Sequence, residues 1–243
     1  MTKSELTVRT AIIEACRAMN ASGLNQGTSG NISVRHGNVM LITPTAQPYD
    51  RLQPEMIAAL PIVTAAAASY GRWSGPLKPS TEWRFHLDIL AAKPEVAAIV
   101  HAHSTYATTL AMTRRAIPAC HYMIAAFGGT DVRCAGYARY GTKALSDLAL
   151  AALADRSACL LANHGMITTG PTLEKAMWLA VELETIARQY HQSLLIGGPV
   201  LLSDAEIAEV RDGFAGYGVQ ESMAKPDAVP TSPPSTPRSR RKA

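Results

Sequence analysis

Two histidines separated by a single residue, His101 and His103, follow an apolar run at residues 96–100. The run predicts a buried strand, on which side chains two apart share a face at about 6.5–7 Å, close enough to bind one metal ion. A third histidine, His164, follows a second apolar run, and a carboxylate, Glu82, precedes a helical pattern. Three imidazoles with a fourth position held by a carboxylate or substrate are typical of a catalytic zinc site rather than a closed structural one.

A histidine at the end of a strand is more often hydrogen-bonded or exposed than bound to metal. Spacing alone does not show that the two strands meet, so the metal hypothesis depends on the fold bringing His164 to the pair. The remaining histidines have weaker patterns. We expect them to be structural or exposed to solvent: His36, His86, His121 and His191.

The elements that must position these residues alternate between helical and strand patterns. Apolar residues at helical spacing predict helices over residues 4–22, 105–112, 142–153 and 172–194, and another that Ser80 or Thr81 caps. Apolar or alternating runs predict strands over residues 32–35, 39–43, 96–100, 158–162 and 166–169. This alternation predicts an α/β layered domain with loops gathered around the end of the histidine strand.

Two polar segments offer groups that bind phosphate. The loop at residues 27–31 is small and rich in glycine, but it lacks the spacing of the nucleotide-binding glycine motifs, which favours an ordinary turn. Ser80 and Thr81 precede a helix, whose N-terminus attracts anions. Plain helix capping needs only one hydroxyl, so the residues alone leave both interpretations open.

Composition excludes several classes of protein. The whole net charge of +4 comes from residue 225 onward, where five basic residues outnumber one acidic residue, so the body is neutral and does not favour nucleic-acid binding. This Pro- and Ser-rich stretch predicts a disordered tail over residues 223–243, after a catalytic domain at 1–222. No apolar run is long enough for a membrane span, and the first residues predict a helix rather than a signal segment. Scattered cysteines without C-x-x-C spacing indicate reduced thiols in the cytoplasm: Cys16, Cys120, Cys134 and Cys159.

Taken together, these motifs resemble the class II aldolase/adducin family. The resemblance runs in order from about residue 5 to residue 222. It is carried by GTSGNISVR (27–35), KPSTEWRFH (78–86), VHAHSTYA (100–107), NHG (163–165) and further segments at 42–49, 117–129, 140–142, 170–184, 202–207 and 214–218. The resemblance implies a three-layer αβα sandwich with a mostly antiparallel central sheet, a bound Zn²⁺ or another divalent metal, and a homotetramer with sites between subunits.

The same resemblance assigns roles to residues. It implies that zinc is bound by His101, His103, His164 and Glu82, and that Glu82 is also the base. It implies a proton-donating role for Tyr122, which reaches in from a neighbouring subunit, and a pocket-shaping role for Tyr217. The positions implied to surround the substrate phosphate are Gly30, Asn31, Thr45, Ala46, Ser80 and Thr81, where Ala46 stands in place of the family's usual glycine.

The implied activity is zinc-dependent cleavage of a ketose 1-phosphate, L-fuculose 1-phosphate or an analogue, into dihydroxyacetone phosphate and a small aldehyde. The metal stabilises an enediolate, so no Schiff-base lysine is needed. The alternatives are a 3-oxo-tetronate 4-phosphate decarboxylase, which uses the same enediolate, and a non-catalytic adducin-like interaction module. Related 4-epimerases carry Asp at the position of Glu82, which disfavours that activity.

Overall fold

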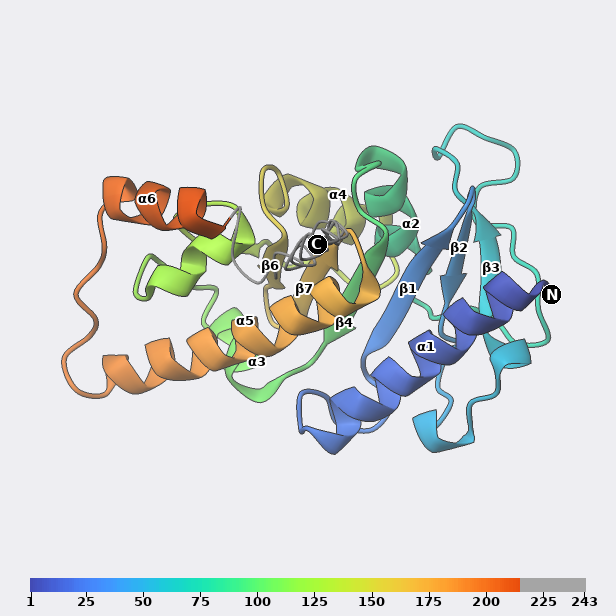
Figure 1. Ribbon diagram of the computed structural model, residues 1–243, viewed down its shortest axis with the longest axis horizontal. Helices are drawn as coiled ribbons and strands as arrows, with labels where there is room; N and C mark the ends of the chain where they lie inside the picture. Colours follow the sequence, from blue (N-terminus) through green and yellow to red (C-terminus); the bar gives the residue numbers. More distant parts are fainter. Residues whose placement is uncertain (215–243) are drawn as a thin grey trace, which may run out of the picture.

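A seven-stranded sheet forms the centre of the computed structural model, which describes residues 1–214 (Figure 1). The strand order is β3-β2-β1-β4-β7-β6-β5, and every neighbouring pair is antiparallel except β5 and β6. The strands are β1 (Asn31–His36), β2 (Val39–Ile42), β3 (Ala58–Pro61), β4 (Ala98–Ala102), β5 (Arg133–Ala135), β6 (Ala158–Leu161) and β7 (Gly165–Gly170). The central position of β4 places the histidine strand in the middle of the sheet.

Helices cover both faces of the sheet. One layer contains α1 (Lys3–Ala21), α3 (Thr105–Met112) and α5 (Leu173–Leu194), and the other contains α2 (Trp83–Ala92) and α4 (Lys143–Ala152). The prediction of a three-layer αβα sandwich with a mostly antiparallel sheet is therefore confirmed. The short helices are η1 (Tyr49–Arg51), η2 (Pro54–Met56) and η3 (Tyr122–Phe127), and α6 (Asp204–Phe214) packs beside η3. No helix in residues 1–214 combines the length and the apolar composition needed to cross a membrane.

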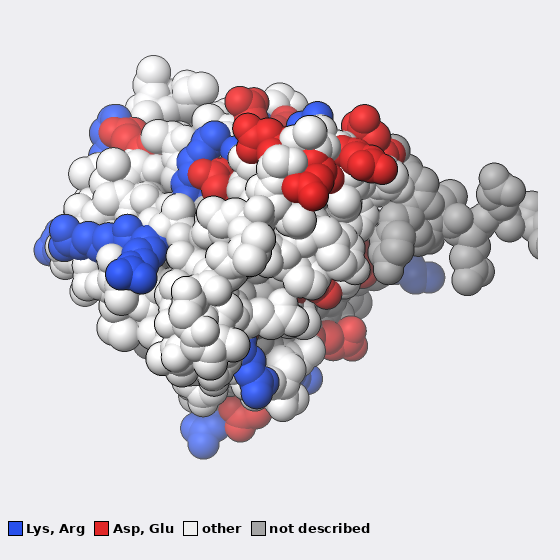
Figure 2. Space-filling view, turned by 90° about the vertical axis from the view of Figure 1, so that its left-hand side faces the viewer, with Lys and Arg blue, Asp and Glu red and all other residues white. Residues whose placement is uncertain are grey.

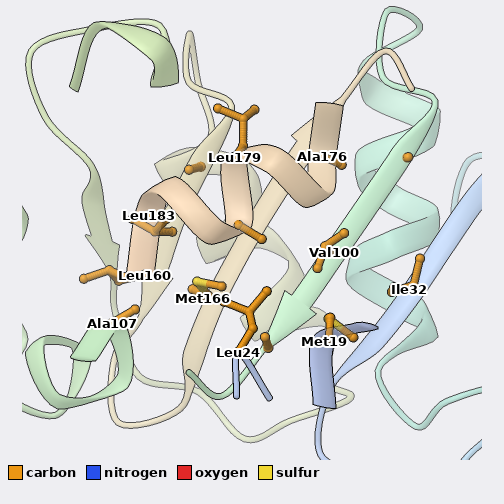
Figure 3. Close-up of a cluster of buried hydrophobic side chains, with 14 of the residues drawn as sticks. Met19, Leu24, Ile32, Val100, Ala107, Leu160, Met166, Ala176, Leu179 and Leu183 are labelled. Atoms are coloured by element: carbon orange, nitrogen blue, oxygen red, sulfur yellow. The ribbon is translucent and has the colours of Figure 1, made fainter. Parts of the chain in front are cut away.

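Two apolar cores lie on opposite faces of the sheet. Figure 3 shows part of the larger one, where Leu179 and Leu183 of α5 lie over Val100 of β4 and Met166 of β7. Along β4 the side chains alternate, so Val100 belongs to this core while Ile99 belongs to the core under α2 and α4. His101 shares the face of Ile99 and therefore points toward α2.

The predicted elements agree with the structure to within a few residues. The elements that the sequence patterns did not predict are β3, β5, α6 and the three 3₁₀ helices. β5 has three residues and β3 ends at a proline, so neither repeats the strand pattern long enough to stand out. The predicted tail at residues 223–243 lies outside the described residues.

Candidate metal centre

Four side chains from three separate segments meet at the end of β4. Glu82, His101, His103 and His164 each offer a ligand atom, and these atoms lie within 4.8 Å of one another. The three imidazole rings stand 4.9 Å apart, centroid to centroid, in each pairing. They meet because β4 pairs with β7, which follows directly after the turn that carries His164. The fold thus supplies the strand pairing that spacing alone left open.

The orientation of His101 is fixed by the backbone of β7. Its Nδ1 lies 2.8 Å from the carbonyl oxygen of Met166, so Nδ1 carries the proton and donates it. In the neutral imidazole, Nε2 therefore carries the lone pair that can bind a metal ion, and it faces His103 Nε2 at 3.0 Å. A backbone carbonyl that orients the far side of an imidazole is the usual support of a histidine metal ligand. The donor set, three imidazole nitrogens and a carboxylate, fits a divalent ion such as Zn²⁺.

Glu82 occupies the N-cap position of α2, which corrects the prediction that Ser80 or Thr81 would cap this helix. The Ser80 hydroxyl instead accepts a hydrogen bond from the Glu82 backbone N–H at 3.3 Å, one step before the helix. The Glu82 side chain makes no capping hydrogen bond. Its carboxylate lies between two imidazoles, with Oε2 3.1 Å from His101 Nε2 and Oε1 3.1 Å from His164 Nε2. Its Oε1 is buried without a hydrogen bond, as expected of an atom placed to bind a cation.

The turn before β7 presents His164 under tight steric limits. Asn163 adopts a left-handed conformation with φ +53°, which asparagine tolerates better than most residues. At Gly165 a Cβ atom would lie 2.6 Å from the carbonyl oxygen of Ala102 and 2.8 Å from a ring carbon of His103. Only glycine therefore lets β7 approach β4 closely enough for the three imidazoles to converge.

Charge within the site follows from burial and proximity. Burial raises the pKa of Glu82, but the imidazoles of His101 and His164 outweigh that effect and hold the pKa well below its usual range. Burial, together with the neighbouring imidazoles of His101 and His164, lowers the pKa of His103 to about 3. The site therefore holds an ionised carboxylate and, at His103, a neutral imidazole near pH 7, which are the protonation states that bind metal.

A second layer of side chains supports the carboxylate. Asn31, predicted as a phosphate-binding residue, donates from Nδ2 to Glu82 Oε2 at 3.0 Å. Behind it, His86 Nε2 lies 2.5 Å from Asn31 Oδ1, and His86 is completely buried. Of the two expectations for His86, burial in the structure rather than exposure to solvent is the one observed, and no sequence pattern indicated its connection to the metal site.

A cavity of about 370 Å³ opens onto the cluster and is lined by Glu82, His103 and His164. Three of the predicted phosphate-binding residues, Thr45, Ala46 and Thr81, lie on its wall. Gly30, Asn31 and Ser80 are buried and do not line it. The wall also includes residues outside the predicted set of site residues: Thr28, Ser29, Tyr137, Ala138, Tyr140 and Asn163. Thr28 and Ser29 belong to the polar loop at residues 27–31, and Tyr140 belongs to the matched segment 140–142, so the sequence did contain a signal for these three residues.

Tyr122, one of the two predicted catalytic tyrosines, does not line this cavity within one chain. Tyr122 is 50 % exposed at the start of η3, where it lines a different pocket together with Trp178 and Glu182. Its ring lies against that of His121, with the two centroids 4.6 Å apart. Tyr217 lies outside the described residues.

Comparison with known proteins places this geometry among related folds. Residues 10–191 match the family model described as the class II aldolase and adducin N-terminal domain. The chain is 46 % identical over 228 residues to a 5-methylthioribulose-1-phosphate/5-deoxyribulose-1-phosphate aldolase of Rhodospirillum rubrum, covering 94 % of this chain and 100 % of the relative. It is 44 % identical over 210 residues to the L-fuculose phosphate aldolase of Escherichia coli K12, covering 86 % of this chain and 94 % of the relative.

A solved structure of an L-fuculose 1-phosphate aldolase superimposes with a TM-score of 0.82 at 36 % identity. The match covers 88 % of this chain and 98 % of that one. The sequence and structural similarities therefore span the sheet, both helical layers and the metal-ligand cluster.

Proposed function

This chain belongs to the class II aldolase and adducin family and is a metal-dependent aldehyde-lyase, and we propose that it is a zinc-dependent aldolase of ketose 1-phosphates. The products would be dihydroxyacetone phosphate and a small aldehyde. The observation that carries the proposal is the convergence of three imidazoles and a buried carboxylate beside a cavity with hydroxyl groups on its wall. Relatives named for two kinds of ketose 1-phosphate support this substrate class.

His101, His103 and His164, with Glu82 in the fourth position, would hold the zinc ion. The bound ion would supply an electrophile that stabilises the negative charge of the enediolate formed next to the ketone. The protein contributes a fixed donor geometry, since Met166 orients His101 and the Gly165 turn orients His164. Because these ligands are held in place, they need to move little when negative charge develops on the substrate.

Glu82 is the group placed to move a proton at carbon. In the direction of synthesis it takes a proton from C3 of dihydroxyacetone phosphate, and the enediolate then attacks the aldehyde carbon. In the direction of cleavage it returns that proton to C3. Glu82 is ionised in the free site, and it would be free to accept the proton once the substrate has taken its place at the metal. Tyr122 would exchange the second proton, at the oxygen that becomes the aldehyde.

The phosphate would bind beside the polar loops that form the cavity wall. Thr45 and Thr81 offer hydroxyl groups there, and Thr81 is exposed and not used as a helix cap. Ala46 adopts φ +53°, the left-handed conformation that explains why glycine suits this position. Gly30, Asn31 and Ser80 would support this loop cluster from behind. Binding energy at the remote phosphate would orient the reacting carbons above the metal.

We propose that the site is completed by a neighbouring subunit of a homotetramer. Tyr122 lies outside the cavity of its own chain, so it needs another chain to reach a zinc site, and Tyr217 would shape the same pocket. Between α5 and α6, exposed apolar side chains are available to pack against a second chain: Leu195 (69 %), Ile196 (87 %), Val200 (93 %) and Leu201 (53 %). Figure 2 shows few charged side chains over the centre of this face. These exposed apolar side chains are the ones we propose to contact the second chain.

We also propose that the enzyme acts in the cytoplasm. All four cysteines are free thiols, and two of them, Cys16 and Cys159, are buried. Burial raises the pKa of each of these two thiols far above its ordinary value, so neither is a reactive thiolate. Unpaired thiols of this kind are typical of a reducing compartment.

The activity is tested by supplying three ketose 1-phosphates to the zinc-loaded protein. These are 5-methylthioribulose 1-phosphate, 5-deoxyribulose 1-phosphate and L-fuculose 1-phosphate, which share the phosphate end and differ at the aldehyde end. Release of dihydroxyacetone phosphate from at least one of them, abolished by a chelator, is the expected result. Release from none of the three, with CO₂ released from a 3-oxo acid phosphate instead, would support the decarboxylase. No turnover of either class would support the interaction module.

A further inference from the structure

Three buried polar side chains form a chain of hydrogen bonds that ends on Glu82. Ser33 Oγ lies 2.7 Å from His86 Nδ1, and His86 Nε2 lies 2.5 Å from Asn31 Oδ1. Asn31 Nδ2 then donates to Glu82 Oε2 at 3.0 Å. Ser33 and His86 are fully buried, and Asn31 is 4 % exposed, so water does not satisfy these groups.

The protons along this chain have a single consistent arrangement. An ionised carboxylate only accepts, so Asn31 must turn its NH₂ group toward Glu82 and its carbonyl oxygen toward His86. That oxygen also only accepts, so the proton of a neutral His86 must lie on Nε2. Nδ1 then accepts, and the Ser33 hydroxyl donates to it. Each group therefore fixes the orientation of the next.

We propose that His86 is a positioning residue, whose Nε2–H locks the Asn31 amide in the orientation that holds the Glu82 carboxylate at the metal centre. Without that donor the Asn31 side chain is free to rotate and turn its carbonyl oxygen toward the carboxylate. The inference rests on Glu82 serving the metal site, as in the proposed function. The proposal gives a role to His86, which is not one of the metal ligands and does not line the cavity.

A simpler role for His86 is to fill space, since its ring stacks on Phe85 with centroids 4.6 Å apart. Phe85 in turn contacts the ring of His101 edge-on at 5.5 Å. A residue that only fills space has no reason to carry its proton on a particular nitrogen. The tautomer of His86 therefore separates the two roles.

The first test measures the tautomer of His86 in the wild-type protein. Multiple-bond ¹⁵N NMR of histidine-labelled, zinc-loaded wild-type protein reports the tautomer of each neutral imidazole, and the His86 signal is assigned by its loss in His86→Gln. The expected result is the Nε2–H tautomer. A proton on Nδ1, or a doubly protonated ring, would overturn the proposal.

Two variants test the consequence for the metal. In His86→Gln the side-chain amide reaches the place of Nε2 and keeps a donor for Asn31, whereas the shorter side chain of His86→Asn reaches only the place of Nδ1. We expect zinc affinity, measured by chelator competition, to stay within about threefold of wild type in the first and to fall roughly 10–100-fold in the second. In an Asn31→Ala background, His86→Asn should cause no further loss, because the chain is already broken.

Equal zinc affinity in the two folded His86 variants, or an equal loss in both, would contradict the proposal. Neither the tautomer nor the zinc affinity involves a sugar phosphate. A failure of the proposed aldolase activity would therefore leave these results intact, and the reverse also holds. If both variants unfold, the His86 signal of wild-type protein is assigned through its contact with the Phe85 ring, and the tautomer still decides.

Discussion

Asn31 and His101 lie directly opposite each other on the antiparallel strands β1 and β4. Both side chains reach the same atom, since Asn31 Nδ2 lies 3.0 Å and His101 Nε2 3.1 Å from Glu82 Oε2. A slip of one residue in this pairing would turn one of the two side chains to the other face of the sheet. The register of two central strands therefore sets the geometry at the carboxylate, which rigidifies the metal centre.

Replacing His101 should remove the metal. We expect about one zinc ion per chain in wild-type protein, and loss of nearly all of it in His101→Ala, because three donors without the backbone-oriented imidazole bind far more weakly. The measurement is elemental analysis after dialysis against zinc-free buffer. His36→Ala is the matched control, since the His36 side chain is hydrogen-bonded to Ser4 and does not belong to the metal-ligand cluster. Unchanged zinc content in His101→Ala would disprove the ligand assignment.

Replacing Glu82 by glutamine should stop proton transfer at carbon. The amide keeps the size of the side chain but is not a base, so exchange of the C3 hydrogen of dihydroxyacetone phosphate should slow by about 10²–10⁴-fold. Zinc content is measured on the same sample, because Glu82 also neighbours His101 and His164. Wild-type exchange rates in a zinc-bound Glu82→Gln protein would assign the base to another residue.

Tyr122→Phe should separate the two proton transfers. It removes the hydroxyl proposed to act at the aldehyde oxygen, so cleavage should slow by at least about tenfold more than C3 exchange does. Tyr106→Phe, which removes a hydroxyl from a groove beside α5, serves as the control. Equal slowing of cleavage and exchange in Tyr122→Phe would argue that this tyrosine holds subunits together rather than moving a proton.

Stability of the metal-free protein should fall as the pH drops below about 6.5. Burial and, to a smaller extent, the neighbouring His101 lower the pKa of His86 to about 3. Similar causes lower the pKa of His103 to about 3. The unfolded chain therefore binds more protons than the folded one between pH 3 and 6.5, so the free energy of unfolding decreases through this window.

The slope reaches about 1.4 kcal/mol per pH unit for the fully buried His86, and less for the partly exposed His103. Glu82, whose pKa is depressed, adds to the loss only below about pH 4.5. Urea unfolding at pH 7.5 and 5.5 thus isolates the histidines, and His86→Gln should show a shallower dependence. Equal stability at the two pH values would show that these imidazoles are not held neutral.

Ala46→Gly should stabilise the protein slightly. A left-handed backbone at φ +53° costs an alanine about 1–2 kcal/mol, while glycine costs about 0.4–1 kcal/mol through the greater freedom of the unfolded chain. The free energy of unfolding, measured in urea, should therefore rise by up to about 1.6 kcal/mol. Ala15→Gly, inside helix α1, should instead lower it by about 1 kcal/mol. A similar loss in both variants would indicate that Ala46 is not strained.

Local pattern explains why much of this molecule was predictable. The repeated apolar positions of α1 and α5 and the apolar runs of β4 and β6 predicted elements that the structure contains. The histidine pair on β4 was a local signal for the same reason, because a strand places alternate residues on one face. The resemblance of the ordered motifs to an aldolase family then supplied the sheet type that local pattern could not.

What escaped prediction depends on contacts between distant segments. His86 has the spacing of an ordinary helical residue, and only the packing of α2 against β1 joins it to Asn31 and Glu82. The N-cap of α2 was misplaced for a related reason, since hydroxyls in a row favour capping while the tertiary site holds Glu82 at that position. Tyr122 remains a prediction, because its proposed partner is another chain.

The most direct test of the account follows deuterium entering C3 of dihydroxyacetone phosphate in D₂O, using zinc-loaded protein with and without a chelator. Exchange needs the metal ligands, the Glu82 base and the phosphate site together, but not the unknown aldehyde. We predict stereospecific exchange at C3 that stops when zinc is removed and returns when it is restored. Folded, zinc-bound protein that exchanges no hydrogen would contradict the aldolase mechanism.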